Sequence, residues 1–199
     1  MAGPAQRADD QVSTQRPRPR RIVTGHDARG RSIIVSDGPA PNVVSPPGLP
    51  ENVASVMWVT DRVPASNAGN EDAAPADLKA AMGPPEGGVL LRIADFPPDS
   101  AYDGVDIGEM FDHINRGDDP RNGVPPESFE KHFWFHKTPT LDFAICLDGE
   151  IWALLDEDET RMLPGDVLIQ RGTSHAWANR TDKPARMAFV LIDGVDDGP

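Results

Sequence analysis

Short apolar segments separated by turn residues dominate the last third of the chain. From residue 131 onward these segments follow one another closely, and Gly, Pro, Asp and Asn occupy the gaps between them. Strands with such regular punctuation are typical of an all-β sandwich or barrel. The expected strands are Lys131–Lys137, Leu141–Leu147, Glu150–Asp156, Arg161–Leu163, Asp166–Gln170, His175–Asn179 and Arg186–Ile192.

The earlier part of the chain alternates between a few strands and long stretches without apolar periodicity. Arg21–Thr24 and Arg31–Val35 are expected to form a hairpin around Gly30, and Ser55–Thr60 and Gly88–Phe96 are two further strands. Residues 61–87 and 97–128 are rich in Pro, Gly and Asp or Asn, which predicts two long loops. Loops of this length inside a compact domain usually serve as functional lids or as dimer contacts.

Composition and charge narrow the range of partners. The 199 residues carry a net charge of −13, so we expect neither nucleic acid nor an anionic membrane surface to bind. No apolar run reaches the ~20 residues that span a bilayer, and the first residues lack a signal-peptide core, which favours a cytoplasmic protein. Cys146 is the only cysteine, lies in an apolar run, and is interpreted as a buried core residue.

Three residues in the strand-rich region carry candidate chemistry. His136, Asp142 and His175 together offer two imidazoles and one carboxylate, a set that binds a divalent metal and leaves open positions for substrate or dioxygen. His175 lies far along the chain from the other two, so closure of a barrel would have to bring it near. The alternatives are that each histidine is a hydrogen-bonded core residue and that Asp142 caps a turn.

The spacing of these residues resembles the two motifs of the cupin superfamily. In the first motif, His136-Lys137-Thr138 is followed by three residues, Asp142, six residues and Gly149. The second motif resembles the run from Gly165 through Gly172 and His175 to Asn179. Thr138 replaces the second histidine of the family pattern and Asp142 replaces its glutamate, so the implied ligand set is reduced to two histidines and one carboxylate.

The resemblance implies a jelly-roll β-barrel with an N-terminal strand extension and long loops. Together with the polar, proline-containing composition of the first residues, it divides the chain into a disordered arm at 1–19, N-terminal strands and loops at 20–128, a cupin core at 129–193 and an acidic tail at 194–199. It also implies one bound divalent metal ion, with Fe²⁺ favoured over Zn²⁺, Mn²⁺ or Ni²⁺, and a homodimer that pairs through the N-terminal strands.

Strand parity suggests the walls of the pocket around this metal. His132 shares parity with His136 but lies too far along the strand to be a ligand, and it is the candidate catalytic acid or base. An arginine at the mouth, Arg92 or Arg171, could hold a carboxylate or phenolate of the substrate. The predicted substrate-pocket residues are Trp134, Thr138, Gln170, Trp177, Asn179 and Arg92.

Three classes of function are consistent with this pattern. The favoured one is an Fe(II) dioxygenase acting on a small organic substrate, such as an aromatic or carbonyl-containing compound. A non-redox lyase, dehydratase, isomerase or decarboxylase that uses the metal to polarise a carbonyl is the first alternative. The second is a cupin that binds a small ligand without turnover.

Overall fold

A computed structural model describes residues 16–49, 51–79, 82–114 and 120–195. The main element is a six-stranded sheet, so the expected all-β class is confirmed, and the strand arrangement is consistent with the expected jelly roll. Its strands, in spatial order, are β3 (Asn42–Val44), β4 (Val53–Thr60), β5 (Val89–Phe96), β11 (Ala185–Ile192), β6 (Leu141–Asp148) and β9 (Val167–Arg171). The N-terminal strands β3–β5 therefore belong to the barrel itself, because β11 joins them to the C-terminal strands.

A second, three-stranded sheet faces the first. It contains, in order, β10 (His175–Ala178), β7 (Ile151–Leu155) and β8 (Glu159–Met162). Alternate residues of both sheets point into the space between them and form the main core, in which Cys146 is 1% exposed. The interpretation of Cys146 as a core residue is confirmed.

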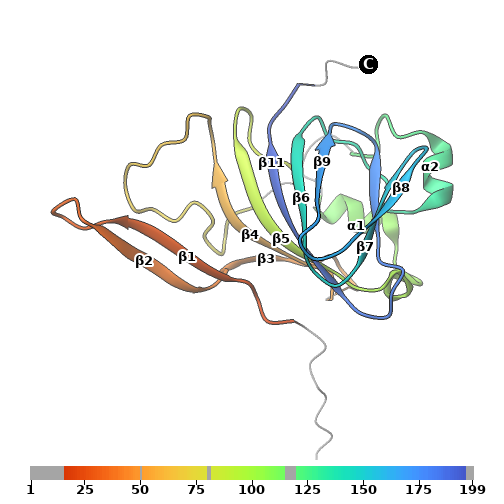
Figure 1. The fold of residues 1–199 in the computed structure, drawn as a ribbon, viewed down its shortest axis with the longest axis horizontal. Coiled ribbons are helices and arrows are strands. Elements are labelled where there is room, and N and C mark those ends of the chain that lie inside the picture. Colours follow the sequence, from red (N-terminus) through yellow and green to blue (C-terminus); the bar gives the residue numbers. More distant parts are fainter. Residues whose placement is uncertain (1–15, 50, 80–81, 115–119, 196–199) are drawn as a thin grey trace, which may run out of the picture.

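The first two strands form a separate hairpin. Strands β1 (Arg20–His26) and β2 (Ser32–Pro39) pair only with each other in the described structure, and the ribbon projects away from the barrel (Figure 1). The expected hairpin around Gly30 is thus present and is longer than predicted. Residues 1–15 and 196–199, which include most of the expected arm and tail, lie outside the described residues.

The stretch expected as one loop at 97–128 contains helices. They are a 3-10 helix η1 (Asp99–Tyr102), α1 (Ile107–Ile114) and α2 (Pro126–Lys131). None of the helices in the described ranges is long and apolar enough to cross a membrane. The loop expected at 61–87 holds no regular element in its described part.

The prediction of a strand at Lys131–Lys137 is wrong. Its first residue ends α2, and the rest is irregular apart from one isolated bridge at His136. The aromatic residues that suggested a strand have another role here. Phe133, Trp134 and Phe135 pack with the helices against the outer side of the three-stranded sheet, in a second apolar cluster.

Candidate active site

The two histidines of the motif are held together by their backbones. The amide of His136 donates to the carbonyl of His175 at 2.9 Å, and the amide of His175 donates back at 3.0 Å. In such an antiparallel pair the two side chains lie on the same side. The ring centroids are accordingly only 4.2 Å apart, with 50° between the ring planes.

Backbone carbonyls fix the tautomer of both rings. Nδ1 of His136 lies 2.7 Å from the carbonyl oxygen of Trp134, and Nδ1 of His175 lies 3.0 Å from that of Thr173. A carbonyl can only accept, so each Nδ1 carries the proton and donates it. Nε2 of each ring is left with a free lone pair, as in histidines that bind metals.

Burial keeps both imidazoles neutral. Desolvation, followed by the neighbouring His175, holds the pKa of His136 well below its usual 6.5. Desolvation likewise lowers the pKa of His175 to about 4. At neutral pH both rings therefore present unprotonated nitrogen, the form that ligates a metal or accepts a proton.

Asp142 is the third motif residue and lies on β6 with its side chain turned inward. It is 5% exposed, and burial raises the pKa of its carboxyl group, opposed by a hydrogen bond from Thr140 and by the charge of Arg92. Its Oδ1 is buried and has no hydrogen-bond partner among the described residues. An unpaired carboxylate oxygen in the interior costs free energy. Binding of a cation or a proton by Asp142 would offset that cost.

Arg92 brings a positive charge to the same space from β5. Its Nη2 donates to the carbonyl of Met82 at 2.6 Å, and its guanidinium lies 6.0 Å from the centre of the Phe189 ring. Burial lowers the pKa of Arg92 to about 10, against the opposing charge of Asp142. The described contacts include no ion pair between Arg92 and Asp142, so neither charge is neutralised directly by the other.

These groups line one cavity of about 110 Å³ between the two sheets. Seven of the predicted site residues contribute to its wall, namely His136, Asp142, His175, Trp134, Thr138, Trp177 and Arg92. The rest of the wall is mainly apolar and includes Phe96, Phe189 and Leu191. A small, mostly apolar space with a few convergent polar groups is the usual form of a binding site for a small molecule.

His132 does not line this cavity. Its Nε2 lies 3.4 Å from Oδ2 of Asp99, and its ring stacks on Phe133 with centroids 4.3 Å apart. The strand that was expected to carry His132 into the barrel is absent, because α2 ends at the residue before it. A direct acid or base role for His132 therefore has no geometric support.

Gln170 and Asn179 also lie outside the cavity wall. The side-chain amide of Gln170 donates to the carbonyl of Thr173 at 2.8 Å, which closes the turn before β10. Asn179 follows the end of β10 and donates to the carbonyls of Phe96 and Lys183 at 2.9 and 2.8 Å. Both residues stabilise the backbone around the site rather than touching what it holds.

The wall also contains residues that sequence reasoning missed. Phe96, Phe189 and Leu191 come from β5 and β11, Asn52 directly precedes β4, and Met82 lies within the long loop at 61–87. The alternation in β11 marks Phe189 and Leu191 as sharing a face, which was a usable signal. Nothing in the sequence alone could have shown that β5 lies beside β11.

The donor atoms are of the types that bind a divalent metal, but only some of them are placed closely enough to do so. Two neutral imidazoles with free Nε2 atoms stand side by side, and the unpaired Oδ1 of Asp142 supplies the expected carboxylate. Within the described ranges, however, no three His, Cys, Asp or Glu side chains are grouped closely enough to hold an ion. The histidine pair is in place, and Asp142 would have to move toward it to complete the set.

Comparison with known proteins finds similarity to one domain family over the C-terminal part of the chain. Residues 124–192 match the family model of the cupin domain. The chain is 28% identical to the cupin-domain-containing oxidoreductase fogC of Aspergillus ruber, over 88% of this chain and 73% of that protein. It is 27% identical to the cupin-domain-containing oxidoreductase virC of Hypocrea virens, over 87% and 75% of the two chains.

A solved structure is also similar. A cupin 2 conserved barrel domain protein from Salinispora arenicola aligns with 75% of this chain and 82% of its own, at 13% identity and a TM-score of 0.36. The family model spans the segment that carries both motif histidines, Asp142 and strands β6 to β11. About a third of the chain therefore matches the cupin domain, and that third holds the candidate site.

Proposed function

We propose that this protein is a metal-dependent cupin oxidoreductase acting on a small organic substrate. The observation that carries the proposal is the pair of neutral imidazoles, each with Nδ1 hydrogen-bonded to a carbonyl and Nε2 free, in an apolar cavity. Two relatives that align over most of this chain are named oxidoreductases, which favours redox over non-redox chemistry.

His136 and His175 would hold the ion, and Asp142 would complete a set of two histidines and one carboxylate. This set suits Fe(II) and leaves positions open for a substrate and dioxygen, so an Fe(II) dioxygenase is the specific activity we propose. A bound ion would supply redox and Lewis-acid chemistry. The apolar walls exclude water from the cavity and so strengthen every electrostatic contact within it.

Arg92 indicates which chemical group the substrate carries. Its guanidinium faces a cavity that otherwise offers mainly aromatic and aliphatic surface, and among the described residues it donates to the backbone carbonyl of Met82. Further donors of the guanidinium remain for a carboxylate or an enolate. We therefore propose a substrate with one anionic group beside an apolar body, oriented by Arg92 toward the histidine pair.

Metal analysis of histidine variants tests this function. Protein loaded with Fe(II) without oxygen should bind about one equivalent, and His136→Ala or His175→Ala should each weaken binding by at least ~100-fold, because each removes one of very few ligands. His132→Ala is the matched control, since it removes a histidine outside the cavity and should leave iron content unchanged. Full iron content in either of the first two variants, with the fold intact, would overturn the proposed site.

A further inference from the structure

Strand β9 has a polar residue at a buried, inward-facing position. Leu168 and Gln170 alternate with the exposed Val167, Ile169 and Arg171, so both point toward the interior. Leu168 packs against the main core, whereas Gln170 is 2% exposed and carries a primary amide. Burial of an amide costs free energy unless its donors are bonded. The partners of Gln170 therefore indicate what this residue does.

The amide of Gln170 makes two hydrogen bonds to Thr173. Its Nε2 donates to the carbonyl oxygen of Thr173 at 2.8 Å and also to the Thr173 hydroxyl. A carbonyl can only accept, which assigns the nitrogen of the amide to this contact. Asp142 lies directly across from Gln170 on β6, yet Oδ1 of Asp142 has no hydrogen-bond partner within the described ranges. The donors of Gln170 therefore serve the turn before β10 and not the neighbouring carboxylate.

The same carbonyl oxygen fixes the ring of His175. Nδ1 of His175 lies 3.0 Å from it. A carbonyl oxygen has two lone pairs, so it can accept from Gln170 and His175 at once. Side chains from β9 and from the start of β10 thus meet at one atom of the turn between them. The direction of this carbonyl determines the orientation of the His175 ring and which ring nitrogen keeps its lone pair.

The two histidines differ in how their carbonyl partners are held. The carbonyl that accepts from His136 belongs to Trp134, whose ring is 6% exposed within the second apolar cluster. The carbonyl that accepts from His175 belongs to Thr173, which is exposed in an irregular turn. Aromatic packing keeps the first carbonyl in place, whereas the buried amide of Gln170 holds the second one from inside.

We propose that Gln170 is a positioning residue that holds His175 in the tautomer with Nε2 unprotonated, as the proposed ion requires. The inference rests on the proposed function for the bound group, but the contacts among Gln170, Thr173 and His175 are present without it. If the Gln170 amide is removed, the Thr173 carbonyl can turn toward water, and the Nε2–H tautomer of His175 gains population. That tautomer carries its proton on the nitrogen that would ligate the ion.

Ring ¹⁵N NMR spectra of the full chain without added metal test this role. In the wild type both His136 and His175 should be Nδ1–H tautomers. Gln170→Met keeps a side chain of similar length but has no donor, and it should raise the Nε2–H population of His175 about tenfold, the effect of one lost hydrogen bond. His136 should not change, because its carbonyl partner lies in another segment. An unchanged His175 tautomer in folded Gln170→Met would overturn the proposal.

Fe(II) binding without oxygen gives a second measurement. Gln170→Met should weaken Fe(II) binding by ~10-fold, less than the loss expected when His175 itself is removed. A wild type that binds no Fe(II) would refute the proposed function, while the tautomer measurement would still decide the role of Gln170. Wild-type Fe(II) affinity in a variant whose His175 tautomer has shifted would show that the tautomer does not control binding, and would overturn the proposal.

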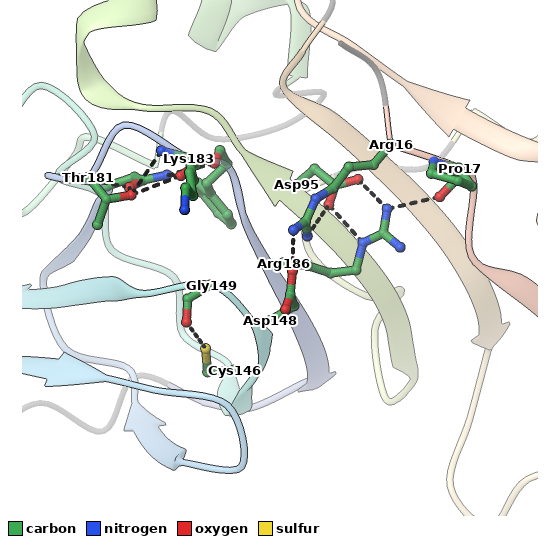
Figure 2. Close-up of polar contacts among 11 residues, drawn as sticks. Arg16, Pro17, Asp95, Cys146, Asp148, Gly149, Thr181, Lys183 and Arg186 are labelled. Atoms are coloured by element: carbon green, nitrogen blue, oxygen red, sulfur yellow. Dashed lines mark hydrogen bonds and ion pairs between the residues drawn. The ribbon is translucent and has the colours of Figure 1, made fainter. Parts of the chain in front are cut away.

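Two control variants separate this role from a general loosening of the turns beside β10. Figure 2 shows Thr181, which donates to the carbonyl of Lys183 at 2.9 Å in the turn after β10. Thr181→Val should leave the His175 tautomer and the Fe(II) affinity unchanged. Thr173→Val removes the hydroxyl but keeps the carbonyl, so it should retain the Nδ1–H tautomer. A shift in either control as large as that in Gln170→Met would contradict a specific role for Gln170.

A measurement on the wild type does not depend on the folding of any variant. Scalar couplings across hydrogen bonds should connect the carbonyl carbon of Thr173 with Nδ1 of His175 and with Nε2 of Gln170. Coupling to His175 alone would show that Gln170 does not hold this carbonyl, and it would overturn the proposal.

Discussion

The two sheets of this protein carry the same alternation of apolar residues but differ in what lies outside them. The three-stranded sheet is covered by the chain's own helices and by Trp134 and Phe135. The six-stranded sheet has an outer face, turned away from the cavity, on which four aliphatic side chains are exposed, namely Leu141, Leu147, Val167 and Ile169. Alternation of a strand shows that a face avoids water. It does not show whether the same chain or another one supplies the cover.

The largest loss of stability should come from a cavity between α1 and the three-stranded sheet that it covers. Phe111→Ala on α1 removes a ring that is 1% exposed and packs edge-on to Trp134 at 5.4 Å. We expect it to lower the free energy of unfolding by about 3–5 kcal/mol. Phe143→Ala on the outer face is the matched control and should lower it by only ~1 kcal/mol in dilute protein. Urea unfolding at low concentration measures both, and equal losses would mean that the two faces do not differ.

A smaller loss of stability should follow from breaking the ion pair between Arg186 and Asp95, which lies at one end of the outer face. Arg186→Met leaves the carboxylate of Asp95, which is 6% exposed, without its bidentate partner. The expected loss is about 2 kcal/mol in thermal or chemical unfolding. Arg180→Met breaks a pair of similar geometry with Glu159 that lies in solvent, where a loss below ~1 kcal/mol is expected. A larger loss for Arg180→Met would show that burial does not set the strength of these pairs.

The smallest effect concerns the single guanidinium in the cavity wall. Arg92→Met should weaken the binding of acetate, a small carboxylate that fits the cavity, by about tenfold, or ~1.4 kcal/mol. Trp134 and Trp177 line the cavity, so tryptophan fluorescence can follow the titration. Arg171→Met on the outer face is the control and should bind acetate as the wild type does. Equal weakening in both variants would exclude a specific role for Arg92.

The sequence predicted the C-terminal strands well because each is short, apolar and bounded by turn residues. It failed at Phe133–Phe135, where three consecutive aromatic residues suggested a strand but pack under the helices. It also missed α1, although Ile107, Met110 and Phe111 have helical spacing, because Pro, Gly and Asp dominate the surrounding residues.

The residues predicted from the motif spacing lie together at the cavity. Several residues predicted from strand parity alone do not. His136, Asp142 and His175 share one cavity wall, as expected, but His132 was placed by counting along a strand that does not form. Arg92 could be named only as one of two arginines at the mouth. Its position depends on the pairing of β5 with β11, whose residues lie about a hundred positions apart in the chain, and no local pattern encodes that pairing.

The reciprocal hydrogen bonds between His136 and His175 have a thermodynamic consequence. They join two segments that are 39 residues apart in the chain. The loop-closure entropy for bringing the two imidazoles together is therefore already spent when the barrel folds. An ion or ligand that bridges the two rings binds to a preorganised site. Its affinity therefore reflects the energy of its contacts and is not reduced by a cost of ordering the chain.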